Sequence, residues 1–106
     1  MRYFQITPVE TIALGERLFV ELEGRQIMLL NIGGEIHAIG DVCTHDNGAL
    51  GDGEIEEHEI ICPRHGARFD VRNGKVLSLP AIEDIPAYPV KVVDGEIQIG
   101  VPISEN

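Results

Sequence analysis

Two short segments of this sequence each carry a cysteine and a histidine, residue types well suited to bind a transition metal. One residue separates Cys43 from His45, two separate Cys62 from His65, and sixteen lie between the two pairs. In an extended segment, residues i and i+2 point to the same side, so Cys43 and His45 can face one site. Cys62 and His65 can do the same around a tight loop that Pro63 restricts. Together the segments offer two thiolates and two imidazoles, a set that suits tetrahedral zinc or an iron–sulfur cluster.

The spacing of these ligands distinguishes the two kinds of site. Structural zinc sites usually pair like residues, as Cys-x2-4-Cys and His-x3-5-His. Here each segment offers one of each, and a gap of one residue is tight for chelating a single ion. It suits two adjacent metals that each take one ligand from each segment, as in a [2Fe–2S] centre with two cysteines on one iron and two histidines on the other. The spacing therefore favours a [2Fe–2S] cluster, with zinc as the alternative.

Short strands must position these segments, because apolar residues alternate or run in short blocks along most of the chain. We expect strands at 17–22, 25–32, 35–39, 69–71, 75–77, 90–93 and 96–99. Dipeptides that supply the positive φ angles of hairpin turns separate them, namely Gly33-Gly34, Asn73-Gly74, Asp94-Gly95 and, more weakly, Glu23-Gly24. At most one short helical turn is expected, within 8–14. The pattern predicts an all-β fold, an antiparallel sandwich or barrel.

The stretch 40–86 has a different composition from the rest. It holds both cysteines, three of the four histidines, three of the six prolines and half of the 12 glycines. We expect one domain, 1–106, in which 40–86 is a small metal-binding subdomain inserted between the early and late strands.

The segments 43–45 and 62–66 resemble the ligand motif of Rieske-type [2Fe–2S] proteins, and the resemblance covers nearly the whole chain. It implies a Rieske-type β-sandwich that carries a small cluster-binding subdomain. It also implies that Cys43 and Cys62 bind a buried iron of one [2Fe–2S] cluster. His45 and His65 would bind the outer iron, near the surface where partners dock.

The sequence departs from the high-potential respiratory members of that family. Those members carry a further cysteine in each loop, joined in a disulfide, where this chain has Gly48 and Arg64. They also have a serine and a tyrosine whose hydroxyls donate hydrogen bonds toward sulfur, where this chain has Ala67 and Phe69, which donate nothing. These departures match the soluble Rieske-type ferredoxins that feed electrons to oxygenases.

The resemblance thus implies a one-electron carrier with a low-potential cluster and no catalytic activity of its own. Electrons would come from an NAD(P)H-dependent flavoprotein reductase and pass to a terminal oxygenase of the ring-hydroxylating type. One alternative is a Rieske-like small subunit or regulatory module of another redox system, such as nitrite reductase or cluster assembly. The other is a zinc-binding interaction module.

Charge and hydropathy limit the partners and the compartment. Eight basic and 18 acidic residues give a formal charge of −10, which repels nucleic-acid phosphates and suits steering toward a basic partner. No apolar stretch approaches the roughly 18 residues that a membrane-spanning helix needs. The first residues lack the apolar run of an export signal. We therefore expect a cytoplasmic protein that binds neither nucleic acid nor membrane.

Residues around the two segments carry weaker predictions. Arg68 and Asp70 are expected to pair and brace the second loop. His37 and His58 have no cysteine close by and are expected to be structural. The loop at 80–81 is either a cover over the cluster or a simple connection. Glycines of the loops would let backbone amides approach the cluster sulfides, namely Gly48, Gly51, Gly53 and Gly66.

Overall fold

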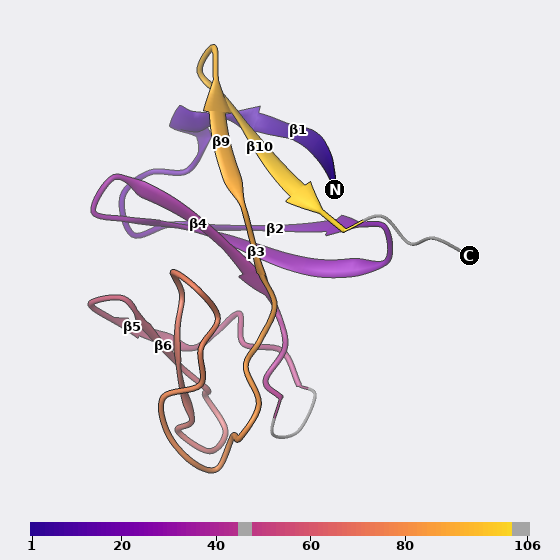
Figure 1. Ribbon diagram of the computed structural model, residues 1–106. Coiled ribbons are helices and arrows are strands. Elements are labelled where there is room, and N and C mark those ends of the chain that lie inside the picture. The colour runs from indigo at the N-terminus through magenta and orange to yellow at the C-terminus, as the bar shows by residue number, and fades with distance from the viewer. Residues whose placement is uncertain (45–47, 103–106) are drawn as a thin grey trace.

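The computed structural model describes residues 1–44 and 48–102, which fold into three antiparallel sheets (Figure 1). The first sheet has the order β1-β10-β9, with β1 (Arg2–Pro8), β9 (Val90–Val93) and β10 (Glu96–Val101). The second has the order β2-β3-β4-β8, with β2 (Arg17–Leu22), β3 (Arg25–Ile32), β4 (Glu35–Gly40) and β8 (Ala87–Tyr88). The third has the order β5-β6-β7, with β5 (Glu54–Glu56), β6 (Glu59–Ile61) and β7 (Arg68–Asp70). The predicted all-β fold is confirmed.

Two hairpins show why the sequence folds in this way locally. Glu23 and Gly24 have φ angles of 52° and 75°, and Asp94 and Gly95 have φ angles of 51° and 77°. Positive φ at both central residues defines the turn that matches the right-handed twist of the flanking strands. The predicted turns therefore join β2 to β3 and β9 to β10.

Strand β3, in the middle of the second sheet, is buried on both faces and contributes to two separate cores. Ile27 and Leu29 pack with residues of β10 between the first two sheets. Met28 and Leu30 point the other way, into a core that includes both cysteines. In Figure 1 the first sheet accordingly lies above the second, and the third sheet with its loops lies below. Burial of each such side chain stabilises the fold by about 1.5–3 kcal/mol.

Some predicted elements differ from the observed ones. The segment 75–77 is not a strand: Val76 forms only an isolated bridge with Phe69. The Val76 amide donates instead to Asp84 Oδ1 at 2.8 Å, so it is not available to extend a ladder. Four strands were not predicted: β1 and β8 lack a clear alternation, β5 is mostly acidic, and β6 has only three residues.

Helical structure in the described residues is limited to one 3-10 turn at Val9–Thr11, within the predicted segment. No helix in 1–44 or 48–102 is long and apolar enough to cross a membrane.

Candidate metal centre

Two loops carry the candidate ligands, and main-chain hydrogen bonds close each loop on itself. In the loop after β4, the Cys43 amide donates to the Gly48 carbonyl at 2.7 Å. In the loop between β6 and β7, the Cys62 amide donates to the Ala67 carbonyl at 2.7 Å, and the Gly66 amide donates to the Cys62 carbonyl at 3.0 Å. Gly66 has a φ of 76°, a left-handed conformation that glycine adopts without strain. The second loop is therefore a tight turn around Cys62, and a main-chain hydrogen bond joins Cys43 to Gly48 in the first.

The fold brings the two cysteines together, although 18 residues separate them in the sequence. Cys43 and Cys62 are buried thiols in one core, and a hydrogen bond joins their side chains. Burial raises the pKa of the Cys62 thiol. The backbone amides of Arg64 and His65 donate hydrogen bonds to it, and with Cys43 and the Arg64 charge they bring its pKa below the usual value of 9.0. The lowered pKa shifts Cys62 toward the thiolate, the form that binds metals.

This environment fits a [2Fe–2S] cluster. N–H donors aimed at sulfur stabilise a negatively charged iron–sulfur centre. His65, three residues after Cys62, is exposed, so one imidazole stands at the surface while the thiols lie inside. His45, the fourth candidate ligand, lies outside the described residues.

Comparison with known proteins gives the family. Residues 2–89 match the family model described as the Rieske [2Fe-2S] domain. The chain belongs to the Rieske [2Fe–2S] family. Membership of this family implies one [2Fe–2S] cluster.

Ferredoxin components of dioxygenase systems are among the relatives of this Rieske protein. The ferredoxin component of the naphthalene 1,2-dioxygenase system of Pseudomonas putida is 36% identical over 99 residues, which is 93% of this chain and 95% of the relative. The 3-phenylpropionate/cinnamic acid dioxygenase ferredoxin subunit of Escherichia coli (strain K12) is 40% identical over 96 residues, 90% of each chain. The ferredoxin structure of carbazole 1,9a-dioxygenase from Nocardioides aromaticivorans IC177 superposes with a TM-score of 0.86 at 29% identity, covering 93% of this chain and 97% of that one.

An arginine connects the two loops of this Rieske domain. Arg64 Nη1 donates to the Ala49 carbonyl at 2.9 Å. The Arg64 guanidinium also lies against Gly48, because a Cβ placed on Gly48 would be 2.6 Å from Arg64 Cζ. Gly48 and Arg64 are the positions at which the respiratory members were expected to carry a disulfide. Here the Arg64 side chain lies across the two loops.

Two further residues support the first loop, and the sequence did not single them out. Arg17 Nη1, from β2, donates to the Gly51 carbonyl at 2.5 Å. Asp41 Oδ1 accepts a hydrogen bond of 2.8 Å from the Leu50 amide. Their partners are backbone atoms, so no motif marks them.

Steric crowding explains why one of the loop positions is a glycine, without the predicted approach of backbone amides to the cluster sulfides. At Gly53, a Cβ would lie 2.3 Å from the Ile61 carbonyl, so only glycine allows this contact between β6 and the segment before β5. The predicted donation of amides to sulfides stays a prediction.

The predicted pairing of Arg68 with Asp70 is wrong. Arg68 pairs with Glu59 at 3.3 Å and Glu56 at 3.5 Å, and Asp70 pairs with Arg72 at 2.8 Å. Residues two apart in a strand, such as Arg68 and Asp70, share a face, but they pair with each other only when neighbouring segments offer neither of them another partner. Here β5 and β6 present two glutamates to Arg68, and the turn after β7 returns Arg72 to Asp70.

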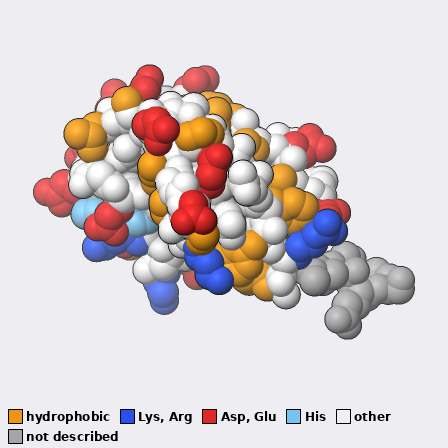
Figure 2. Space-filling view, turned by 90° about the horizontal axis from the view of Figure 1, so that it is seen from above, with side chains coloured by type: hydrophobic (Ala, Val, Ile, Leu, Met, Phe, Trp, Pro, Cys, Tyr) orange, Lys and Arg blue, Asp and Glu red, His pale blue; other side chains and the backbone are white. Residues whose placement is uncertain are grey.

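The remaining two histidines lie together in this Rieske protein. His37 of β4 and His58 of the β5–β6 turn form an edge-to-face pair with ring centroids 6.2 Å apart. Burial lowers the pKa of His37. Figure 2 shows His side chains beside Asp, Glu, Lys and Arg side chains at one edge of the molecule. The pair joins the second sheet to the third, in keeping with the predicted structural role.

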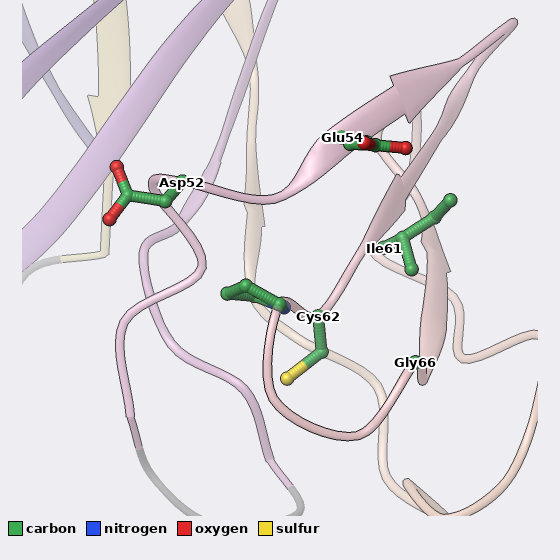
Figure 3. A pocket seen from close by; sticks show the side chains of 6 residues that line it. Asp52, Glu54, Ile61, Cys62 and Gly66 are labelled. Atoms are coloured by element: carbon green, nitrogen blue, oxygen red, sulfur yellow. The ribbon is translucent and has the colours of Figure 1, made fainter.

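A cavity of about 350 Å³ opens beside Cys62 (Figure 3). It is lined by residues of the second ligand loop and of the segment leading into β5: Asp52, Glu54, Ile61, Cys62, Pro63 and Gly66.

Proposed function

We propose that this protein is the ferredoxin component of an aromatic ring-hydroxylating dioxygenase system, a one-electron carrier without catalytic activity of its own. The observation that carries the proposal is the joint burial of Cys43 and Cys62 below an exposed His65. Relatives that are 36% and 40% identical over at least nine-tenths of both chains are ferredoxins of such systems.

We propose four ligands for the cluster. Cys43 and Cys62 bind the inner iron, and His45 and His65 bind the outer iron. A [2Fe–2S] cluster, when bound, supplies reversible one-electron transfer. The amides of Arg64 and His65 stabilise negative charge on the Cys62 sulfur. The exposure of His65 supports an electron route that leaves the cluster at the surface.

The surface beside the ligand loops suits docking of a redox protein. Leu79 and Ile82 are 75% and 78% exposed, so two large apolar side chains of one loop face solvent. Thr44 Oγ1 donates to the Glu83 carbonyl at 2.6 Å, which ties this apolar loop to the first ligand loop. Ala81, between the exposed residues, is buried in the core that contains both cysteines. This arrangement favours a covering role for the loop at 80–81.

We propose a terminal oxygenase as the acceptor and an NAD(P)H-dependent flavoprotein reductase as the donor. A solved complex of oxygenase and ferredoxin in carbazole 1,9a-dioxygenase contains a chain that superposes with a TM-score of 0.84 at 26% identity. Because nicotinamide-dependent reductases draw on the cytoplasmic NAD(P)H pool, we propose a cytoplasmic location.

The experiment that tests this function starts from protein purified with its native metal. We expect about two irons and two acid-labile sulfides per chain, a visible spectrum that bleaches with dithionite, and reoxidation of the reduced protein by an oxygenase component. The oxygenase of the 3-phenylpropionate dioxygenase system of Escherichia coli is a suitable probe, because its ferredoxin is 40% identical to this chain. A protein that holds zinc instead, or a reduced protein that no such oxygenase reoxidises, would contradict the proposal.

A further inference from the structure

The part of the chain that carries the candidate ligands has one basic side chain among many acidic ones. Between positions 43 and 67 the sequence has a single lysine or arginine, which is Arg64. The same stretch has six acidic residues: Asp46, Asp52, Glu54, Glu56, Glu57 and Glu59. Negative charge of this kind repels an added electron, as does the formal charge of −10 of the whole chain. A positive charge held beside the cysteines opposes that repulsion.

The fold holds the Arg64 guanidinium where the two ligand loops meet. Arg64 belongs to the loop of Cys62, but its Nη1 donates to the Ala49 carbonyl of the first loop at 2.9 Å. Gly48 leaves the space for this contact, because a Cβ there would lie 2.6 Å from both Cζ and Nη2 of Arg64. The Gly48 carbonyl in turn accepts the hydrogen bond of the Cys43 amide at 2.7 Å. A side chain from one cysteine loop is thus seated on the main chain of the other.

The Arg64 charge acts on at least one of the two sulfurs. Burial raises the pKa of the Cys62 thiol, but hydrogen bonds to its sulfur together with the Arg64 charge outweigh burial and bring the pKa below 9.0. A nearby cation favours the more negative of two states, whether the change is loss of a proton or gain of an electron. The charge that favours the thiolate therefore also favours the reduced form of a cluster bound to it.

We infer that Arg64 raises the reduction potential of the cluster, because its guanidinium is held across both ligand loops by the Ala49 carbonyl and by the space at Gly48. The inference rests on the proposed function and adds to it a residue that is not a proposed ligand. Arg64 acts through its charge, which offsets part of the field of the surrounding carboxylates and makes the carrier easier to reduce. Because Arg64 is exposed, dissolved salt weakens this effect.

Reduction potentials of cluster-loaded variants test the inference. Arg64→Gln removes the charge. Gly48→Ala keeps the charge but displaces the guanidinium, and alanine is tolerated by the backbone because Gly48 does not have a positive φ. Arg2→Gln is the matched control, because it removes the same charge from β1 in the first sheet. Each potential is measured by spectroelectrochemistry at low salt and at about 1 M salt, where the screening length falls to about 3 Å. The visible spectrum and the iron content report that each variant is loaded.

Arg64→Gln is expected to lower the equilibrium constant of reduction about fivefold at low salt, which is about 40 mV at about 59 mV per factor of ten. Gly48→Ala is expected to lower it about twofold, and Arg2→Gln to leave it within about 1.5-fold of wild type. These differences should shrink at about 1 M salt.

An unchanged potential in Arg64→Gln, or equal decreases in Arg64→Gln and Arg2→Gln, would overturn the inference, because the charge would then have no local effect. A decrease that salt does not alter would also overturn it, by assigning the effect to loosened loops. If Arg64→Gln does not retain the cluster, Gly48→Ala decides, and an unchanged potential in that variant rejects the inference. A wild-type protein without a [2Fe–2S] cluster is a distinct result, because it would reject the proposed function and this inference with it.

Discussion

The first two sheets and the ligand-bearing third sheet are stabilised in different ways. Strands β1 to β4 have six to eight residues each, joined by tight hairpins over an apolar core. Strands β5 to β7 have three residues each, and their loops are supported by hydrogen bonds from side chains such as Arg17 and Arg64. A stable β-sandwich can therefore carry a site made mostly of loops when the sandwich and the site share one sheet. Here β3 is that shared element, because its alternate residues fill both cores.

The largest effect is expected from loss of a proposed ligand. Cys62→Ser or His65→Ala should abolish cluster incorporation, because no neighbouring group can replace the thiolate or imidazole. His37→Ala and His58→Ala, which change the contact between the sheets, should keep the visible spectrum. Absorption and EPR spectra measure the outcome, and a wild-type spectrum in His65→Ala would defeat the ligand assignment.

Truncation of one leucine in each core would test whether the two regions are stabilised independently. Leu29→Ala and Leu50→Ala each remove a fully buried side chain and should lower the free energy of unfolding by about 2–5 kcal/mol. We expect Leu50→Ala also to release the cluster before the sheets unfold, because Leu50 packs in the core that holds both cysteines. Far-ultraviolet circular dichroism and visible absorbance, followed together during denaturation, would separate the two events. Coincident loss of both signals in Leu50→Ala would show that the two regions unfold as one.

The reduction potential of the cluster would test whether the residues packed around the two cysteines determine its redox properties. Rieske centres span roughly −150 to +300 mV, and this protein should lie below zero because Ala67 and Phe69 donate no hydrogen bond to sulfur. Both residues are fully buried in the core with the cysteines, so Ala67→Ser and Phe69→Tyr would place hydroxyls close to the site. A hydrogen bond to a charged group contributes about 1.5–3 kcal/mol, and about 59 mV corresponds to 1.4 kcal/mol for one electron. Since only the difference between redox states counts, we expect an increase of several tens of millivolts per hydroxyl by protein-film voltammetry. A wild-type potential well above zero would show that backbone amides or solvent exposure of the cluster set the potential instead.

Removal of the arginine between the loops should have a smaller effect. Arg64→Ala loses the hydrogen bond to the Ala49 carbonyl and the contact with Gly48, worth about 1 kcal/mol together. We expect the cluster to be released a few-fold faster on incubation with a chelator, with the free energy of unfolding of the sheets little changed. Arg2→Ala, which removes an exposed arginine of β1, is the control. Equal release rates in both variants would show that Arg64 does not support the loops.

The smallest effect is expected from acid titration of the third sheet. Hydrogen bonds from the Arg72 side chain hold the pKa of Asp70 below its usual 3.8, against the opposing effect of burial. A carboxyl whose pKa is lower in the folded state stabilises the protein above its unfolded pKa, and this contribution is lost as pH falls through the folded pKa. Asp70→Asn should therefore cost about 1 kcal/mol at pH 7, and the difference from wild type should shrink below about pH 4. Denaturant unfolding at pH 7 and pH 3 measures it; a difference independent of pH would assign the effect to packing.

The hairpins and the ligand motif are the parts that the sequence predicts best. Positive φ at Asp94 and Gly95 follows from two adjacent residue types, and the strands on either side follow from their apolar pattern. The prediction of a strand at 75–77 was wrong because the Val76 amide donates to the side chain of Asp84 while the Val76 side chain packs against the core. Strand β5 was missed because its ends are glutamates, one of which, Glu56, pairs with Arg68 of β7.

The sequence by itself determined the chemistry and the fold class, since ligand types, their spacing and turn residues are properties of neighbours along the chain. Only the tertiary structure decided that Cys43 lies against Cys62, that Arg64 contacts Gly48, and that Arg68 pairs away from Asp70. Within residues 1–44 and 48–102, it also decided that Arg68 pairs with Glu56 and Glu59 while Asp52 and Glu54 form no ion pair. Each of these depends on which distant segments the packed sheets bring into contact. The spacing of residues along the sequence does not tell which of them pair. Several side chains of opposite charge could pair with each charged residue, and the packing of the sheets decides which of them lies close enough.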